Sequence, residues 1–244
     1  MSTETRTREQ ELGGSSSLGD AFYPVYKWLF KEDGDFVTGV GKKLAQARMS
    51  DNVELFLSRA LAIGVISGLA LWALGLFVGW LFVQMFLAPG THIVPFAIPA
   101  WLEALKTPAI IFVSGIIFGS VGFIIGFGSL VSIPYFRASA REREINVLLS
   151  DAVSFMYALS VGGMNQLEIL QSMAKADDTY GEVAKEFQSI VLETEYFDTD
   201  YRTAIRNQAL ETPSDELSQF LTDMLSIVDS GGDMTDFLQD QKNK

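Results

Sequence analysis

Two long stretches without any charged residue constrain the fold of this chain most strongly. Residues 60–89 and 107–136 each run for about 30 residues without Asp, Glu, Lys or Arg. About 20 consecutive apolar residues let a helix cross a bilayer core, so both stretches are long enough to span a membrane. A signal peptide would have a shorter apolar core nearer the N-terminus. We therefore predict transmembrane helices over 60–88 and 107–136, joined by an extracytoplasmic loop over 89–106.

The basic residues that flank these stretches indicate how the spans are oriented. Lysines and arginines precede the first span and follow the second, whereas the connecting loop holds Lys106 alone. Since segments rich in lysine and arginine stay in the cytoplasm, both termini are expected there. The sequence thus predicts a multi-pass protein of the cell membrane, with cytoplasmic segments over 1–59 and 141–244.

Glycines recur at a spacing of four residues along both predicted spans. They form four pairs: Gly64 and Gly68, Gly75 and Gly79, Gly115 and Gly119, and Gly122 and Gly126. Small residues four apart let two helices approach closely, although glycine is also frequent in membrane helices for other reasons. We favour a packing role, either between the two spans or against the spans of a partner.

The N-terminal segment, residues 1–59, combines a polar tail with apolar, interfacial elements. The stretch "FYPVYKWLFK" over 22–31 gathers five aromatic residues beside two lysines. It suits a helix in the membrane interface, and equally a small apolar cluster packed on the cytoplasmic domain. The following "DGDFVTGVGKK" lacks the first glycine and the final hydroxyl of a phosphate-binding loop. We expect only a turn there, leading into "KLAQARM".

Apolar residues at helical spacing predict a helical bundle after the second span. Positions 145, 149, 152, 156 and 159 form one stripe. Capping residues indicate the starts of five further helices: Asn165 with Glu168, Thr179 with Glu182, the stretch "FDTDYRTAI", Thr212 followed by Pro213 at the first helical position, and Asp233. The predicted fold class is all-α, a two-helix transmembrane hairpin plus a cytoplasmic six-helix antiparallel bundle.

Two pairs of adjacent glycines interrupt the helical pattern of the bundle. Gly162 with Gly163 and Gly231 with Gly232 each follow an apolar run and precede a new helix start. A glycine in the left-handed conformation often ends a helix, because it satisfies the last carbonyl groups without a steric penalty. We therefore assign both pairs, together with Pro213, to structural turns between short-looped helices, in preference to ligand contact.

Nothing in the sequence indicates catalysis, a cofactor or a bound metal. The chain has no cysteine, and its one histidine, His92, lies in the predicted outer loop. The acidic residues scatter over predicted exposed helix faces, so we expect no enzyme activity. Residues 137–244 hold twenty acids against nine bases, a net charge of −11 that would repel nucleic acid. Such an excess suits a salt-rich cytoplasm, in which charge repulsion is screened.

A family resemblance rests on the stretches "LLSDAVSFMYALSVGGMNQLEILQSMAK" and "YRTAIRNQALETPSDELSQFLTDMLSIVDSGGDMTDFL". Together they are similar to the F domain of type II secretion and type IV pilus platform proteins, above all to archaeal members that include archaellum platform proteins. The similarity covers roughly residues 141–240 and rests on the first glycine pair, the "TPSDEL" helix start and "SGGDMTDFL". Family members usually carry a second such domain, so this chain resembles an N-terminal portion. Its acidity resembles that of proteins from salt-loving archaea.

The resemblance implies a function in assembly rather than in chemistry. Platform proteins of this family sit in the cytoplasmic membrane beneath a growing filament, where they engage a hexameric secretion ATPase and guide pilin or archaellin subunits out of the bilayer. By resemblance we expect these partners here, together with membrane lipids and a homo-oligomeric state. Two alternatives stay open: a membrane-anchored adaptor or sensor with a helical cytoplasmic domain, and a membrane enzyme that uses acidic residues.

One junction between predicted helices is a candidate surface for the ATPase. The stretch "ETEYFDTDYR", residues 193–202, places three aromatic residues among four acids. Aromatic residues often dominate the energy of protein interfaces. We therefore predict a partner-contact site of Glu193, Glu195, Tyr196, Phe197, Asp198 and Tyr201. The alternative is that these aromatic side chains belong to the bundle core beneath a loop.

Overall fold

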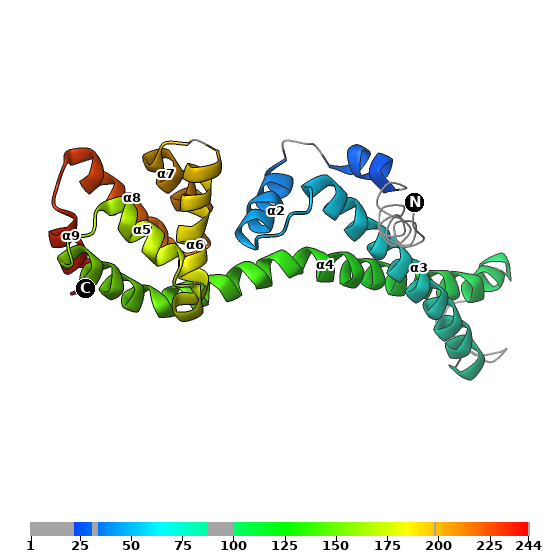
Figure 1. Cartoon of the computed structure of the whole chain (residues 1–244). Helices are drawn as coiled ribbons and strands as arrows, with labels where there is room; N and C mark the ends of the chain where they lie inside the picture. Colours follow the sequence, from blue (N-terminus) through cyan, green and yellow to red (C-terminus); the bar gives the residue numbers. More distant parts are fainter. Residues whose placement is uncertain (1–21, 31–33, 87–99, 198, 244) are drawn as a thin grey trace, which may run out of the picture. The chain divides into compact units, whose positions relative to one another are not determined.

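The structure is a computed structural model that describes residues 22–30, 34–86, 100–197 and 199–243, and Figure 1 shows its helices. A short helix covers residues 22–29. The longer helices are α2 (Asp35–Gln46), α3 (Val53–Phe86), α4 (Ala100–Val161), α5 (Gln166–Ala174), α6 (Asp177–Tyr196), α7 (Tyr201–Glu211), α8 (Asp215–Ser230) and α9 (Met234–Lys242). The described residues contain no strand, so the predicted all-α class is confirmed.

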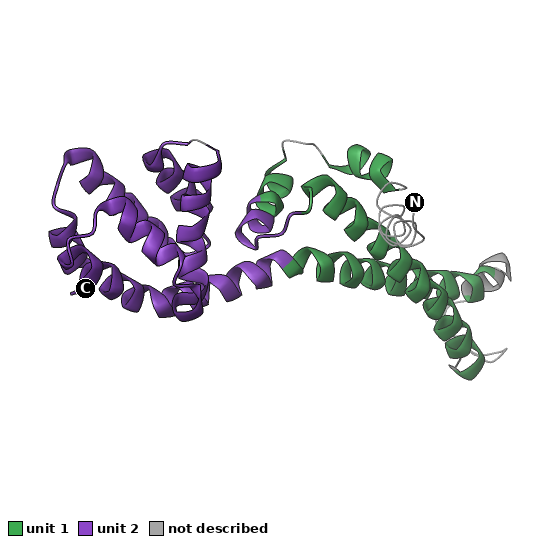
Figure 2. Ribbon diagram, viewed as in Figure 1, with its two compact units in different colours: residues 1–41, 51–133 green, residues 42–50, 134–244 purple. Residues whose placement is uncertain are grey.

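The chain divides into two compact units, coloured separately in Figure 2. Unit 1 consists of residues 1–41 and 51–133, and unit 2 consists of residues 42–50 and 134–244. Helices α2 and α4 each contribute residues to both units. The boundary on α4 lies near the end of the second uncharged stretch, where Arg137 follows.

Helices α3 and α4 both have the length and apolar composition needed to cross a membrane. The candidate spans are Val53–Met85 and Thr107–Val161, in which an 18-residue window reaches a mean hydropathy of 2.3 and 2.4, respectively. Helix α3 begins before the expected start at residue 60, and α4 continues without a break past residue 136. The two predicted apolar helices are therefore present, and each extends beyond its uncharged stretch.

Small residues bring α3 and α4 together in unit 1. A Cβ added to Gly122 would lie 2.6 Å from the Ser67 carbonyl oxygen, and one added to Gly75 would lie 2.8 Å from the Ser114 carbonyl oxygen. The same pairs exchange side-chain hydrogen bonds: Ser67 Oγ donates to the Gly122 carbonyl at 2.9 Å, and Ser114 Oγ donates to the Gly75 carbonyl at 2.8 Å. The predicted packing role of the glycine pairs is confirmed for α3 against α4.

Unit 2 places the last part of α4 and helices α5 to α9 around one apolar core (Figure 1). The stripe predicted on α4 contributes Ile145, Leu149, Ala152 and Met156 to that core. Its largest fully buried side chains from other helices are Met173, Phe187, Ile190, Ile205, Leu217, Leu221 and Leu238. Successive helices from α5 to α9 pack on one another, which short connections between antiparallel helices produce.

Two of the predicted helix starts in the bundle are confirmed by their caps. At α5, the Asn165 side chain accepts from the Glu168 backbone N–H at 3.0 Å, and Glu168 Oε2 accepts from the Asn165 N–H at 2.9 Å. This is a complete capping box. At α9, Asp233 Oδ1 accepts from the Thr235 N–H at 2.7 Å.

Two other predicted starts are wrong, and in both cases a side chain of α4 takes part in the observed cap. Helix α6 begins at Asp177 rather than after Thr179, and Gly181, with φ +47°, interrupts it. The Glu182 N–H that this interruption frees donates to Glu144 on α4 at 3.2 Å. Glu144, which is distant in sequence, thus caps α6 at this internal interruption.

The start of α8 lies two residues later than predicted. Ser214, not Thr212, is the N-cap, and its Oγ accepts from the Leu217 N–H at 3.1 Å. The Ser214 hydroxyl also donates to Asn146 on α4, and Ser214 is fully buried. Pro213 therefore precedes the cap instead of opening the helix, and Thr212 ends α7.

The turn expected before "KLAQARM" is also wrong. Residues 35–46 form the continuous helix α2 despite Gly39 and Gly41. Val37, Val40 and Leu44 lie at helical spacing and are buried. Burial of this apolar face outweighs the helix penalty of two glycines, about 1 kcal/mol each.

Candidate partner-contact site

Each double glycine contains a single residue in the left-handed conformation. Gly163 has φ +85° and Gly231 has φ +70°, whereas neither Gly162 nor Gly232 has a positive φ. The Met164 N–H donates to the Leu159 carbonyl at the first turn, and the Gly232 N–H donates to the Ile227 carbonyl at the second. These bonds satisfy carbonyl groups at the ends of α4 and α8.

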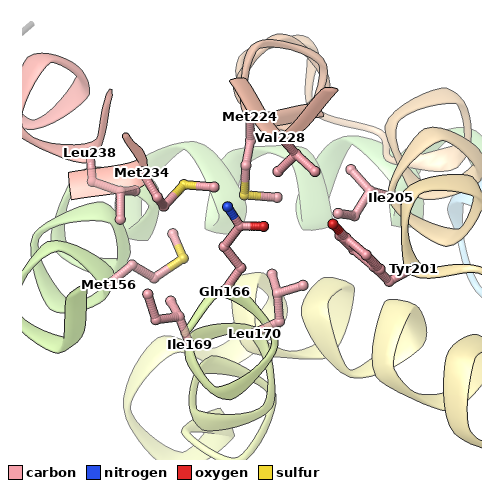
Figure 3. A pocket seen from close by; sticks show the side chains of 10 residues that line it. All are labelled: Met156, Gln166, Ile169, Leu170, Tyr201, Ile205, Met224, Val228, Met234 and Leu238. Carbon is pink, nitrogen blue, oxygen red and sulfur yellow. The ribbon is translucent and has the colours of Figure 1, made fainter. Parts of the chain in front are cut away.

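The two glycine turns lead into the walls of one pocket in unit 2. Gln166 follows the first turn and Met234 follows the second, and both line the pocket together with Tyr201 at the start of α7. Figure 3 shows the ten lining side chains: Met156, Gln166, Ile169, Leu170, Tyr201, Ile205, Met224, Val228, Met234 and Leu238. A more open and more polar groove continues from it and includes Asn165 and Thr235.

The chemistry of this pocket suits apolar contact. Three of its ten lining residues are methionines, whose unbranched side chains adapt to irregular shapes. Its polar atoms come from the Gln166 amide and the Tyr201 hydroxyl, which are labelled in Figure 3. Among the residues that the structure describes, no group of three or more His, Cys, Asp or Glu side chains could hold a metal ion.

The six residues predicted to contact a partner differ in their surroundings. Tyr196 and Phe197, at the end of α6, are 75% and 77% exposed. Tyr201 is half-buried, lines the pocket and packs against the core. Asp198 lies outside the described residues. The core alternative therefore fits Tyr201, whereas the surface interpretation fits Tyr196 and Phe197.

The two glutamates of this set are held by side chains of neighbouring helices. Glu193 Oε1 accepts from Asn207 Nδ2 on α7 at 2.8 Å, and Glu195 Oε1 accepts from Gln171 Nε2 on α5 at 3.1 Å. These bonds connect the end of α6 to both adjacent helices. We call Leu192, Tyr196 and Phe197 the aromatic edge, since all three apolar side chains are exposed.

Sequence reasoning missed a buried ionic centre in unit 2. Glu186 on α6 is 1% exposed and accepts hydrogen bonds from Arg141 on α4, from Gln208 on α7 and, at 3.2 Å, from Arg48. Arg141 Nε also donates to Glu182 Oε2 at 2.7 Å. We call these five residues the ionic centre. Breaking such a buried pair is expensive because it leaves one charge without a partner.

The ionic centre ties the segment after α2 to the bundle. Arg48 donates to the Lys185 carbonyl at 2.6 Å and to Ser189 Oγ at 3.0 Å. Arg141 donates to the carbonyl of Gln46, whose own side chain donates to the Thr212 carbonyl at 3.2 Å. Arg48 has φ +50°, an unfavourable backbone state for a residue with a side chain, so these contacts stabilise a strained position.

Electrostatics at the edge of this centre favour the charged form of Glu182. Burial alone would raise the pKa of Glu182. The hydrogen bonds from Lys185 and Arg141, with the charges of both residues, outweigh burial and lower its pKa from the ordinary value of 4.5.

The sequence does hold one signal of the ionic centre, which is a charged residue at a core-facing position of α4 and another at a core-facing position of α6. Glu186 occupies the face of α6 that also carries Val183 and Ile190, and Arg141 precedes Ile145 by four residues. A charge at a core-facing helix position indicates a buried partner. Sequence alone does not indicate which partner, because the two charges lie on different helices.

Comparisons with known proteins find similarity over the residues of the bundle. Residues 152–243 match the family model of type II secretion system (T2SS) protein F. The chain is 27% identical over 110 residues to flagella accessory protein J of Methanocaldococcus jannaschii, which covers 45% of this chain and 20% of that protein. It is 22% identical over 116 residues to flagella accessory protein J of Methanococcus voltae, which covers 48% and 21%.

A third relative is an uncharacterized protein of Methanocaldococcus jannaschii. It is 33% identical over 101 residues, which are 41% of this chain and 17% of that protein. The chain thus matches about a fifth of the length of these curated relatives. No solved structure matches it.

Proposed function

We propose that this chain is a membrane platform component of a type II secretion, type IV pilus or archaellum-like assembly machine, because residues 152–243 match the family model of T2SS protein F. The observation that carries the proposal is the combination of this domain with two helices apolar and long enough to cross a membrane. Two relatives named flagella accessory protein J favour a filament-assembling machine of archaea.

In this proposal the hairpin anchors the chain and the bundle works in the cytoplasm. The basic residues that flank the hairpin favour cytoplasmic positions for both termini. Cysteine labelling tests this orientation, since the chain has no native cysteine. An impermeant thiol reagent applied to intact cells should label Ala97→Cys and spare Gln239→Cys. The opposite pattern would refute a cytoplasmic bundle.

The bundle would couple a hexameric secretion ATPase to the export of pilin- or archaellin-type subunits. The aromatic edge is our candidate contact, because two large aromatic side chains stand exposed beside the ordered carboxylates of Glu193 and Glu195. A basic surface with an apolar pocket on the ATPase would complement it. We also propose a homo-oligomer in contact with membrane lipids, and no nucleic-acid partner.

The proposal assigns no enzymatic chemistry to the chain itself. The apolar pocket has a volume of only about 10 Å³, and its lining offers one amide and one phenol but no carboxylate or imidazole for acid–base catalysis. We extend the proposal to a salt-rich cytoplasm on the basis of the acid excess. In that case the melting temperature of the full chain should fall as salt is diluted from molar to millimolar concentration.

Co-purification of the intact membrane protein with the cell's secretion ATPases tests the function directly. The chain, solubilised from membranes, should retain an ATPase, and cells without the gene should lack a surface filament. Normal filaments in such cells, with no paralogue present, would contradict the platform role and favour a membrane-anchored adaptor or sensor.

A further inference from the structure

The short helix over residues 22–29 packs on the rest of unit 1 through one of its faces. Tyr26 is buried and stacks on Phe30, with ring centroids 5.6 Å apart. Phe30 stacks in turn on Phe127 of α4 at 6.4 Å. Tyr23 Oη donates to Glu54 Oε2, at the start of α3, at 3.0 Å. The helix therefore contacts both helices of the hairpin.

These two attachments lie on opposite sides of the boundary between charged and uncharged sequence. Glu54 precedes Arg59, the last charged residue before the first uncharged stretch, whereas Phe127 lies inside the second uncharged stretch. Phe127 is level with Gly64 on α3, because a Cβ on Gly64 would lie 3.0 Å from the Phe127 Cβ. Gly64 is five residues beyond Arg59, a rise of about 8 Å along a helix. The short helix thus lies where a membrane surface would meet the hairpin.

A second face of the short helix is apolar and exposed. Val25, Trp28 and Leu29 lie at positions i, i+3 and i+4, on one side of a helix. Their exposed fractions are 44%, 85% and 52%. An exposed tryptophan with two aliphatic neighbours is unfavourable in water, whereas indole rings prefer the boundary between lipid head groups and acyl chains.

We propose that the helix over residues 22–29 lies in the membrane–water interface, with Val25, Trp28 and Leu29 inserted at the level of the lipid head groups. The lipid surface is the occupant that the geometry favours, because the contacts to Glu54 and Phe127 hold the helix where the charged sequence of the hairpin gives way to its uncharged stretches. Interfacial helices insert their apolar side about 5–10 Å into this boundary. An anchor there would set the depth of the hairpin relative to the bilayer surface.

Site-directed spin labelling tests this position, because a single introduced cysteine has no native competitor. The full chain carrying Trp28→Cys would be labelled and reconstituted into vesicles of phosphatidylcholine and phosphatidylglycerol. Collision rates with oxygen, which concentrates in lipid, and with a water-soluble nickel chelate then report the depth of the label. Gln239→Cys, on the exposed surface of α9, is the matched control.

At position 28 we expect a ratio of oxygen to nickel collisions severalfold higher than at position 239. Leu29→Cys should behave as Trp28→Cys does, which guards against a local effect of losing the indole. A ratio at position 28 equal to that at 239 would place the face in water and overturn the proposal. Low collision rates with both reagents would show that protein covers the face, from residues 1–21 or from a second copy, and would also overturn it.

Discussion

The hairpin of unit 1 and the bundle of unit 2 are both made of packed helices, yet different side chains hold each one together. In the hairpin, glycines let the backbones of α3 and α4 approach until Ser67 and Ser114 bond to carbonyl groups across the interface. In the bundle, the helices surround an apolar core of large side chains, and one ionic centre lies buried at the edge of that core.

This difference in packing follows from the solvent of each region, which is lipid for the proposed hairpin and water for the bundle. Lipid is as apolar as a leucine side chain, so large apolar residues gain little by packing between two spans, and close backbone contact becomes the main attraction. In water, burial of apolar area is the dominant favourable term, and the bundle uses it. The comparison therefore predicts that added side-chain volume between α3 and α4 destabilises the hairpin. The bundle, in contrast, should be destabilised by loss of a buried ionic partner.

Loss of the central acceptor in the ionic centre should have the largest effect. Glu186→Ala removes the acceptor that Arg141 shares with Arg48 and Gln208, and leaves the mostly buried Arg141 with Glu182 as its remaining carboxylate partner. Removing one partner of a buried pair costs about 3–5 kcal/mol. The exposed control Glu211→Ala should change the free energy of unfolding by less than about 0.5 kcal/mol. Circular dichroism during thermal unfolding of the full chain measures both, and equal melting temperatures would contradict the role assigned to Glu186.

Added volume in the hairpin should have the next largest effect. Gly122→Leu would force a side chain against the backbone of α3 at Ser67, and overpacking of this kind costs about 1–3 kcal/mol. Gly128→Leu on the same helix is the matched control, because a Cβ there meets nothing within 4 Å. Hydrogen–deuterium exchange of the α3 amides should accelerate in the first variant alone. Acceleration in both would indicate that helix contact is not the cause.

A smaller effect separates a turn glycine from a helix glycine. Gly231→Ala places a side chain at φ +70°, which costs about 1–2 kcal/mol although the space around it is open. Gly39→Ala, inside α2 and equally open, should stabilise the chain by about 0.5–1 kcal/mol. The melting temperature should therefore fall in Gly231→Ala and rise in Gly39→Ala. A shift of the same sign would refute the backbone explanation.

The smallest effect concerns the pH dependence of the bundle. The pKa of Glu182 is lower in the folded state than its ordinary value of 4.5, so the folded state favours the ionised carboxyl. This contribution to stability is fully present above about pH 4.5 and is lost as the pH falls through the lower, folded-state pKa. Glu182→Gln should therefore flatten the acid limb of a plot of melting temperature against pH. An unchanged limb would exclude Glu182 as its source.

Much of this architecture could be predicted from local sequence, and the rest could not for a physical reason. The uncharged stretches, the Asn165 capping box and the α4 stripe depend on neighbouring residues, so their helices were predictable. The inner cap of α6 and the start of α8 depend on Glu144 and Asn146, which lie on another helix. The ionic centre likewise joins four segments. Such partners meet only after folding, so a local pattern does not indicate them.

We propose that the bundle binds its partner at the aromatic edge, and one measurement tests this proposal most directly. The binding affinity of the full chain, in vesicles, for the proposed secretion ATPase should fall in the double variant Tyr196→Ser/Phe197→Ser. A loss of about 2 kcal/mol, roughly thirtyfold in Kd, is expected for an aromatic hot spot. Leu210→Ser, at the opposite end of α7 and 71% exposed, should leave the affinity unchanged. Equal affinity of both variants and the parent chain, with helix content intact, would contradict the account.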